Sequence, residues 1–174
     1  MPSSWYNTPA RLAALDAAAQ SWLGTPFMAN SAVPGPGGGV SCHNLFAELH
    51  FATGFMPRFV VPHGDPAILQ HATPDLLLSR LDAGLLHRGW VPFDLPPSGL
   101  CPLASGFYPV GALAVLRYGR SLHHLVTILA DERVIHVTRL GGVLIEPLAA
   151  LTANPRVQIA ALRLPGSSIL TPDS

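Results

Sequence analysis

The sequence predicts an α+β fold, because helical patterns occupy its first half and short strands occupy its second half. Apolar residues recur at helical spacing in two segments before residue 55, whereas β-rich segments separated by turn residues follow one another from residue 111 onward. Strands in this order form an antiparallel sheet on which the helices pack. With 174 residues, 49% of them hydrophobic and 11% charged, the chain is expected to form a single domain over residues 1–174.

Two N-terminal helices are predicted by their start and stop signals. Thr8 and Pro9 supply a capping side chain followed by proline at the first helical position, so the first helix is expected over residues 9–23. The second helix is expected to begin at Cys42 and to end at about Thr53, where a glycine follows. The apolar side of the first helix is formed by Leu12, Leu15, Ala19 and Trp22.

Two further segments are predicted mainly as loops. Residues 25–40 are rich in Pro, Gly, Ser and Asn and are typical of an irregular loop that leads into Cys42. Residues 55–100 are an insert of proline-rich connections around one helix, which Thr73 and Pro74 begin. This insert is long enough to cover or reshape a cleft beside the second helix.

The predicted sheet contains about five strands. They are expected at residues 112–118, 124–129, 133–138, 143–145 and 157–164, with a short helical turn over residues 147–151. Glycine and acidic residues fall between the first four of them, as expected for the turns of an antiparallel meander.

Cys42 is the candidate nucleophile, because a glycine-rich run ends just before it and a helix is predicted to begin there. In the first turn of a helix, unpaired backbone N–H groups and the positive end of the helix dipole stabilise a thiolate, which is the reactive form of cysteine. The alternative is a small, buried, apolar cysteine. Cys101 is expected to be an ordinary buried or surface thiol, and two cysteines do not make a disulfide scaffold.

A thiol nucleophile needs a base, and two histidines of the predicted sheet are candidates. If the hairpin loop consists of residues 130–132, His124 and His136 are diagonal neighbours on one face, roughly 7–8 Å apart. If the loop consists of residues 131–132 alone, the two histidines lie on opposite faces. The turn residues do not decide between these registers, because the glycine that a three-residue hairpin prefers is absent.

Three motifs in order carry a resemblance to a known family. They are Trp22-Leu23-Gly24-Thr25-Pro26-Phe27, then Gly39-Val40-Ser41-Cys42, then His124-Leu125-Val126-Thr127-Ile128-Leu129 followed by Val134-Ile135-His136. Together they resemble the NlpC-type cysteine peptidases of bacterial cell-wall turnover and phage tails. The resemblance covers about residues 10–140, implies a reduced papain-like fold with the nucleophile at a helix N-terminus, and favours the three-residue hairpin.

The resemblance also implies a catalytic triad and a substrate. Cys42 would attack an amide carbonyl to form a thioester, His124 would move the proton, and His136 would orient His124. The implied function is a cysteine peptidase or amidase that cleaves a peptide or peptidoglycan fragment, typically in a stem peptide, without a cofactor or metal.

Three positions depart from the family pattern and are predicted to contact the substrate. Phe27 stands where the family has tyrosine, Ser41 where it has aspartate, and His43 where it has serine. These departures leave two alternatives open. One is a catalytically degenerate member that acts as a binding or structural module, and the other is a thiol acyltransferase or amidase acting on a substrate outside the cell wall.

Composition and motifs argue against several other classes. Ten basic and ten acidic residues give no net charge, which disfavours a nucleic-acid partner. The sequence has neither an apolar run long enough to span a membrane nor a signal-peptide pattern, so a cytoplasmic protein is expected unless another route, such as a phage-like particle, delivers it.

Metal and nucleotide sites are also disfavoured. A zinc site made of Cys42, His43, His50 and Cys101 would contain adjacent ligands and no paired cysteine spacing. The glycine-rich run before Cys42 lacks the Gly-Lys-Ser/Thr ending of a phosphate-binding loop.

Overall fold

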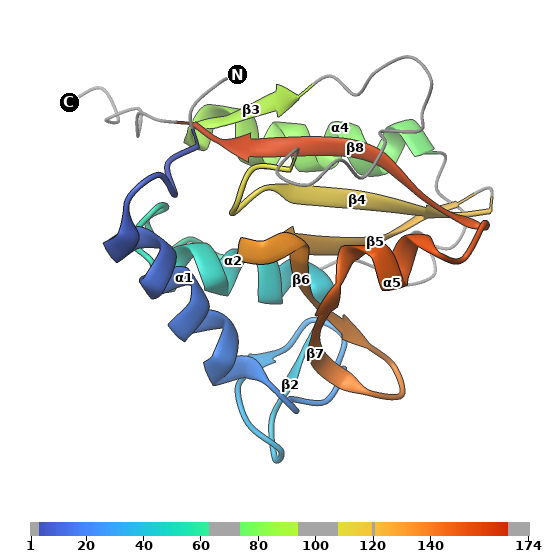
Figure 1. Cartoon of the computed structure of the whole chain (residues 1–174), viewed down its shortest axis with the longest axis horizontal. Helices are drawn as coiled ribbons and strands as arrows, with labels where there is room; N and C mark the ends of the chain where they lie inside the picture. Colours follow the sequence, from blue (N-terminus) through green and yellow to red (C-terminus); the bar gives the residue numbers. More distant parts are fainter. Residues whose placement is uncertain (1–3, 63–73, 94–107, 120, 167–174) are drawn as a thin grey trace.

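The computed structural model describes residues 4–62, 74–93, 108–119 and 121–166, which form an antiparallel sheet with helices on both faces (Figure 1). The sheet has six strands in the order β3-β8-β4-β5-β6-β7. Its strands are β3 (Trp90–Phe93), β4 (Leu113–Tyr118), β5 (Ser121–Ile128), β6 (Arg133–Thr138), β7 (Gly142–Pro147) and β8 (Val157–Pro165). The helices are α1 (Pro9–Trp22), α2 (Cys42–Ala52), α4 (Pro74–Leu85) and α5 (Leu148–Thr152), with short 3₁₀ turns η1 (Leu86–Arg88) and η2 (Ala130–Glu132). This confirms the predicted α+β class, with six strands rather than about five.

Each face of the sheet buries a separate apolar cluster, because successive side chains of a strand point to opposite faces. Leu113 and Val115 of β4 pack in the cluster that also contains residues of α1, α2 and α4. Ala114 and Leu116, which alternate with them, pack in the other cluster together with Leu148 of α5. The predicted packing of helices on the sheet is confirmed, and α2 lies directly against β5 and β6.

Helix α1 forms where its capping and apolar pattern predict it. Its cap, Thr8, accepts a hydrogen bond from the backbone N–H of Arg11, and proline occupies the first helical position. Leu15, Ala19 and Trp22 are buried and Leu12 packs partly buried against the same cluster, so all four predicted apolar positions face the core.

The segment predicted as an irregular loop before α2 contains a small two-stranded sheet, formed by β1 (Ala32–Val33) and β2 (Gly39–Val40). The backbone N–H of Val40 donates to the carbonyl of Pro26 at 2.9 Å, which joins β2 to the chain leaving α1. Strands of two residues carry no alternating pattern, so sequence periodicity does not reveal them. Their effect is to hold the chain just before Cys42 against the rest of the fold.

The described part of the predicted insert contributes the expected helix and one strand that was not predicted. Strand β3 pairs with β8 although Pro92 lies within it, which is possible because β3 is at the edge of the sheet. Arg163 of β8 donates to both carboxylate oxygens of Asp82 in α4, at 2.6 and 2.8 Å. The ion pair and the strand together tie this segment to the sheet.

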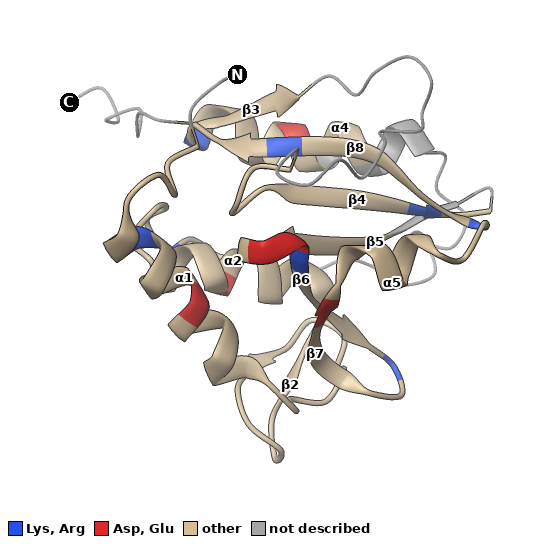
Figure 2. Cartoon of the chain, viewed as in Figure 1, with Lys and Arg blue, Asp and Glu red and all other residues tan. Residues whose placement is uncertain are grey.

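Charged residues are few and are spread over several helices and strands (Figure 2). No helix in the described ranges combines the length and the apolar character that a membrane crossing requires.

His50 of α2 is fully buried in a cluster of aromatic rings. Its ring lies 4.7 Å from Trp90 and 4.9 Å from Phe46, measured between ring centres. Its Nδ1 is 2.6 Å from the hydroxyl of Tyr6, whereas its Nε2 has no hydrogen-bond partner among the described residues. Burial lowers the pKa of His50 to about 3, so this side chain is neutral in the folded protein.

The buried imidazole makes stability depend on pH. An unfolded histidine has a pKa of about 6.5, so the unfolded chain takes up a proton that folded His50 does not. The free energy of unfolding is therefore not reduced by His50 above about pH 6.5. Below that pH, His50 lowers it by roughly 1.4 kcal/mol per pH unit, down to the pKa of His50 in the folded protein. We expect the H50N variant to lose this dependence, because the asparagine amide can face Tyr6 at the position of Nδ1 without titrating.

Urea unfolding at pH 7.0 and pH 5.0 measures this effect. The wild type is expected to lose about 2 kcal/mol more than H50N between the two pH values. The matched control is H87N, which changes an exposed histidine of η1 and is expected to keep the wild-type dependence. An equal loss in wild type and H50N would contradict the prediction.

Candidate active site

The start of α2 places Cys42 at a helix N-terminus, as predicted. Ser41 is the cap residue, and its hydroxyl accepts a hydrogen bond from the backbone N–H of Asn44. The amide side chain of Asn44 donates to the carbonyl of Ser31 at 2.8 Å and so ties the helix to the preceding loop. Cys42 is the first residue of α2 and is partly buried.

The imidazoles of His43 and His124 lower the pKa of the Cys42 thiol. Burial alone would raise the pKa of Cys42, but the charge of His43 and a hydrogen bond with His124 outweigh it and lower the pKa to about 5. The sulfur lies 3.6 Å from Nδ1 of His43. In return, the thiolate raises the pKa of His43 against the opposing effect of burial. Cys42 is therefore a thiolate at neutral pH.

The hairpin between β5 and β6 has the register that a three-residue loop gives. Thr127 pairs with Ile135, and Ile128 pairs with Val134. The loop residues Asp131 and Glu132 take left-handed backbone conformations, with φ of 56° and 53°. The loop thus achieves without glycine the conformation for which glycine is usually chosen. The prediction of a three-residue loop is confirmed.

This register brings His124 and His136 together. They lie beyond the paired residues of the ladder, on one face, with Nε2 of His124 2.7 Å from Nδ1 of His136. Their ring centres are 5.0 Å apart. His124 also helps to lower the pKa of the Cys42 thiol, through a hydrogen bond and through its charge, so these side chains form a chain of contacts in the order Cys42, His124, His136.

The chain of contacts extends to a residue that the sequence reading did not single out. Nε2 of His136 lies 2.8 Å from Oε1 of Glu146 in β7. His136 is 2% exposed, and burial, followed by the charge of His124, lowers its pKa in spite of Glu146. The strand containing Glu146 was expected to end at residue 145 but continues to Pro147.

Of the three residues predicted to contact the substrate, His43 is the one in contact with the Cys42 sulfur. His43 touches the Cys42 sulfur, and Ser41 directly precedes Cys42 as the helix cap. Phe27 forms an isolated backbone bridge with Val40, and the guanidinium of Arg139 lies 5.9 Å from the centre of its ring. Ser41 therefore caps helix α2, whether or not it also contacts a substrate.

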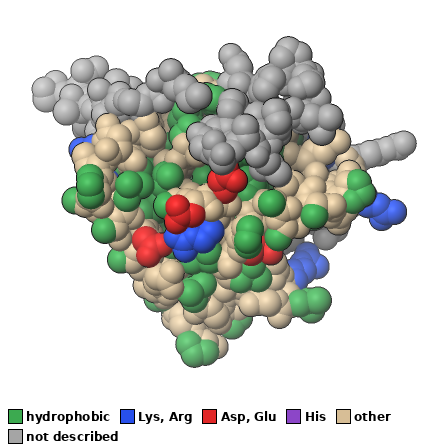
Figure 3. Space-filling view, in the orientation of Figure 1, with side chains coloured by type: hydrophobic (Ala, Val, Ile, Leu, Met, Phe, Trp, Pro, Cys, Tyr) green, Lys and Arg blue, Asp and Glu red, His purple; other side chains and the backbone are tan. Residues whose placement is uncertain are grey.

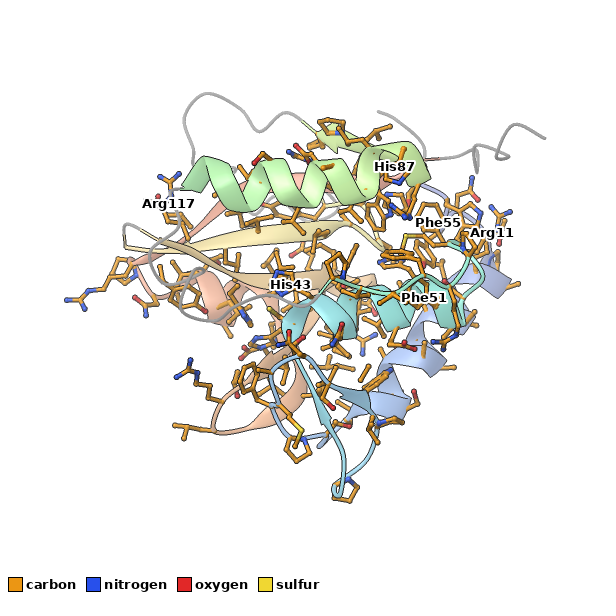
Figure 4. All side chains as sticks on the ribbon, turned by 180° about the vertical axis from the view of Figure 1, so that it is seen from behind. Arg11, His43, Phe51, Phe55, His87 and Arg117 are labelled. Carbon is orange, nitrogen blue, oxygen red and sulfur yellow. The ribbon has the colours of Figure 1, made fainter. Side chains whose placement is uncertain are left out.

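The imidazoles of the site are not visible on the face drawn in Figure 3, where no described histidine reaches the surface. The view from behind in Figure 4 shows His43 at the start of α2. Figure 3 shows acidic and basic side chains next to one another on this face.

Metal-ligating side chains do not gather elsewhere in the described ranges. Among these residues, no group of three or more His, Cys, Asp or Glu side chains is arranged to hold a metal ion. Cys101, which was considered as a zinc ligand, lies outside the described residues. His50 is enclosed by aromatic rings rather than placed beside Cys42.

A helix that begins at a cysteine and packs on an antiparallel sheet carrying a histidine beside that thiol defines a papain-like architecture. Among solved structures, the chain is similar to a Staphylococcus aureus protein described as similar to a lipoprotein of the NLP/P60 family. That match has a TM-score of 0.55 and 13% sequence identity and covers 96% of this chain. The chain spans 44% of the length of that structure. Its fold is therefore of the NlpC/P60 type, as the motifs implied.

Two further structures are similar at lower scores. The P60 domain of an antigen from M. avium paratuberculosis matches with a TM-score of 0.45 and 13% identity, covering 87% of this chain and 90% of that domain. The NlpC/p60 domain of the peptidoglycan hydrolase SagA matches with a TM-score of 0.45 and 14% identity, covering 87% of this chain and 96% of that domain. Neither a protein-family model nor a curated protein matches the sequence.

Proposed function

We propose that the protein is a cysteine-type hydrolase that cleaves an amide bond, with a peptidoglycan stem peptide as its substrate. The observation that carries the proposal is the 2.7 Å hydrogen bond between His124 and His136, together with a Cys42 thiol whose pKa is lowered by His43 and His124. An activated nucleophile is recognised by a base within hydrogen-bond reach and by a third group that orients the base, and this chain of contacts supplies all three.

The proposed reaction has two halves. His124 takes the proton of the Cys42 thiol, and the resulting thiolate attacks the amide carbonyl carbon. The negative charge moves to the carbonyl oxygen, where the backbone N–H of Cys42 at the start of α2 stabilises it. When the C–N bond breaks, His124 donates its proton to the leaving amine and a thioester remains on Cys42. Water then attacks the thioester, His124 takes the proton of that water, and the acid leaves with the thiol restored.

The choice of substrate rests on the motif resemblance and on the fold. The positions where the resemblance places substrate contacts are occupied by Phe27, Ser41 and His43. A phenyl ring replaces the phenol of tyrosine, a hydroxyl replaces the carboxylate of aspartate, and an imidazole replaces the hydroxyl of serine. The preferred stem peptide is therefore expected to differ from that of family members with the usual residues.

The test is hydrolysis of defined muropeptides, with product masses measured by mass spectrometry. The wild type is expected to release two fragments of one stem peptide and, on rapid quenching, to show the acyl fragment attached to Cys42. C42A is expected to release no fragments. Binding of the muropeptide without cleavage by either protein would reject the hydrolase and favour the binding module. Cleavage that survives in C42A would reject Cys42 as the nucleophile.

A further inference from the structure

Glu146 stands at the far end of the chain of contacts that begins at the Cys42 sulfur. Nε2 of His124 is 2.7 Å from Nδ1 of His136, and Nε2 of His136 is 2.8 Å from a carboxylate oxygen of Glu146. Both distances are those of hydrogen bonds, so each neighbouring pair must contain one donor and one acceptor. Which nitrogen donates and which accepts in each of these hydrogen bonds is therefore determined by the group at the Glu146 end.

A carboxylate can only accept hydrogen bonds, whereas a neutral imidazole carries one donor nitrogen and one acceptor nitrogen. Beside Glu146, the Nε2 of neutral His136 must carry the hydrogen, which leaves its Nδ1 as the acceptor. The neighbouring Nε2 of His124 must then be the donor. The remaining nitrogen of a neutral His124, Nδ1, is therefore unprotonated and free to take a proton.

We propose that Glu146 is a positioning residue that sets the tautomers of both His136 and His124, so that His124 offers a basic Nδ1 to the Cys42 thiol. The consequence for catalysis rests on the proposed function, but the tautomers themselves do not. Without the carboxylate, His136 could carry its hydrogen on Nδ1 and reverse both bonds. His124 would then carry its hydrogen on the nitrogen that must accept the thiol proton.

The surroundings of Glu146 suit this role. In the pairing of β7 with β6, Glu146 is opposite Val134 and Leu144 is opposite His136. Because Val134 and His136 are two residues apart, the side chains of Glu146 and His136 lie on the same side of the hairpin. Glu146 keeps 30% of its side chain exposed, whereas His136 is 2% exposed. Tyr118 is a further titratable group near the carboxylate, and its pKa is raised first by burial and then by the charge of Glu146.

The direct test is nitrogen NMR of the imidazole rings, which distinguishes the two neutral tautomers. It is made in the C42A background, so that a charged thiolate does not protonate His124, and at a pH where both rings are neutral. With Glu146 present, both histidines are expected to carry their hydrogen on Nε2. In E146Q the side chain can donate as well as accept, and we expect a substantial population of the Nδ1–H tautomer in both rings.

Matched variants separate this role from a general effect on the fold. E48Q makes the same change at Glu48 of α2, which pairs with Arg58 rather than with a histidine of the site. In E48Q, both histidines are expected to keep the tautomers that they have when Glu146 is present. E146D keeps an acceptor-only carboxylate and is expected to restore the Nε2–H form if E146Q loses it. E146Q with unchanged tautomers in both rings would overturn the proposal.

Kinetics add the consequence for the reaction. In the wild-type background, E146Q is expected to lower kcat on a cleaved muropeptide by about 10- to 100-fold, with KM changed by less than about twofold, because the proposal has Glu146 act through His136 and His124. E48Q is expected to leave both constants unchanged. If the wild type cleaves no muropeptide, the proposed function fails, and the NMR comparison still decides whether Glu146 sets the tautomers.

Discussion

Replacing His124 with alanine is expected to lower kcat for amide hydrolysis by about 10³-fold, within the range of about 10²–10⁴ for the loss of a general acid–base. His124 joins the thiol to His136, with 2.7 Å between Nε2 of His124 and Nδ1 of His136. In H124A the leaving amine departs without a proton from the enzyme, and the thiol loses the hydrogen bond that helps to lower its pKa. Steady-state hydrolysis of the cleaved muropeptide measures the effect.

The thiol gives a second measurement that needs no substrate. We expect the alkylation rate of Cys42, followed against pH with Cys101 replaced, to rise at a higher pH in H124A than in the wild type. H87A is the matched control, because it removes an exposed histidine on η1 and should leave both the hydrolysis and the alkylation profile unchanged. Loss of kcat in H124A smaller than about tenfold, with an unchanged alkylation profile, would contradict the assignment of His124 as the base.

The helices that position the nucleophile could be predicted because their signals are local. Thr8 and Ser41 act as caps in the structure, and each precedes an apolar pattern with a clear end. Strand β3 could not be predicted in this way, because Pro92 argues against a strand unless the strand lies at a sheet edge, and its edge position depends on the pairing with β8.

The histidine pair shows what a resemblance adds to turn chemistry. The residues Ala130, Asp131 and Glu132 allow two hairpin registers, and only the motif spacing from His124 to His136 favoured the one that the structure has. The left-handed conformations at Asp131 and Glu132 explain why local rules gave no answer, since tertiary pairing imposes a conformation that these residues do not prefer.

Glu146 could have been found from the sequence by extending one strand. In the register that the structure has, Gly142 is paired with Thr138 and His136 is paired with Leu144, so strand alternation places Glu146 on the same side as His136. Ending that strand at residue 145 hid the carboxylate. A polar residue at the end of an apolar strand next to a predicted catalytic pair is therefore worth including when the strand limits are uncertain by two residues.

Replacing His43 with alanine is expected to raise the pKa of the Cys42 thiol from about 5 by roughly one to three pH units, the size of a close charge interaction in a partly buried site. The charge of His43 is the largest of the effects that lower this pKa, and its Nδ1 lies 3.6 Å from the sulfur. Alanine favours helices and replaces His43 in the first turn of α2, so the fold is expected to be kept.

The pH midpoint of the thiolate ultraviolet absorbance, with Cys101 replaced, measures this shift. The midpoint is preferable to a single alkylation rate, because a thiolate of higher pKa is also intrinsically more nucleophilic, and the two effects partly cancel in the rate. An unchanged midpoint in H43A would show that the low pKa comes from His124 and the helix terminus. In that case His43, which was predicted to contact the substrate, would be expected to change KM instead. If the midpoint moves while KM stays constant, His43 serves the nucleophile, and the substrate contact predicted for it is absent.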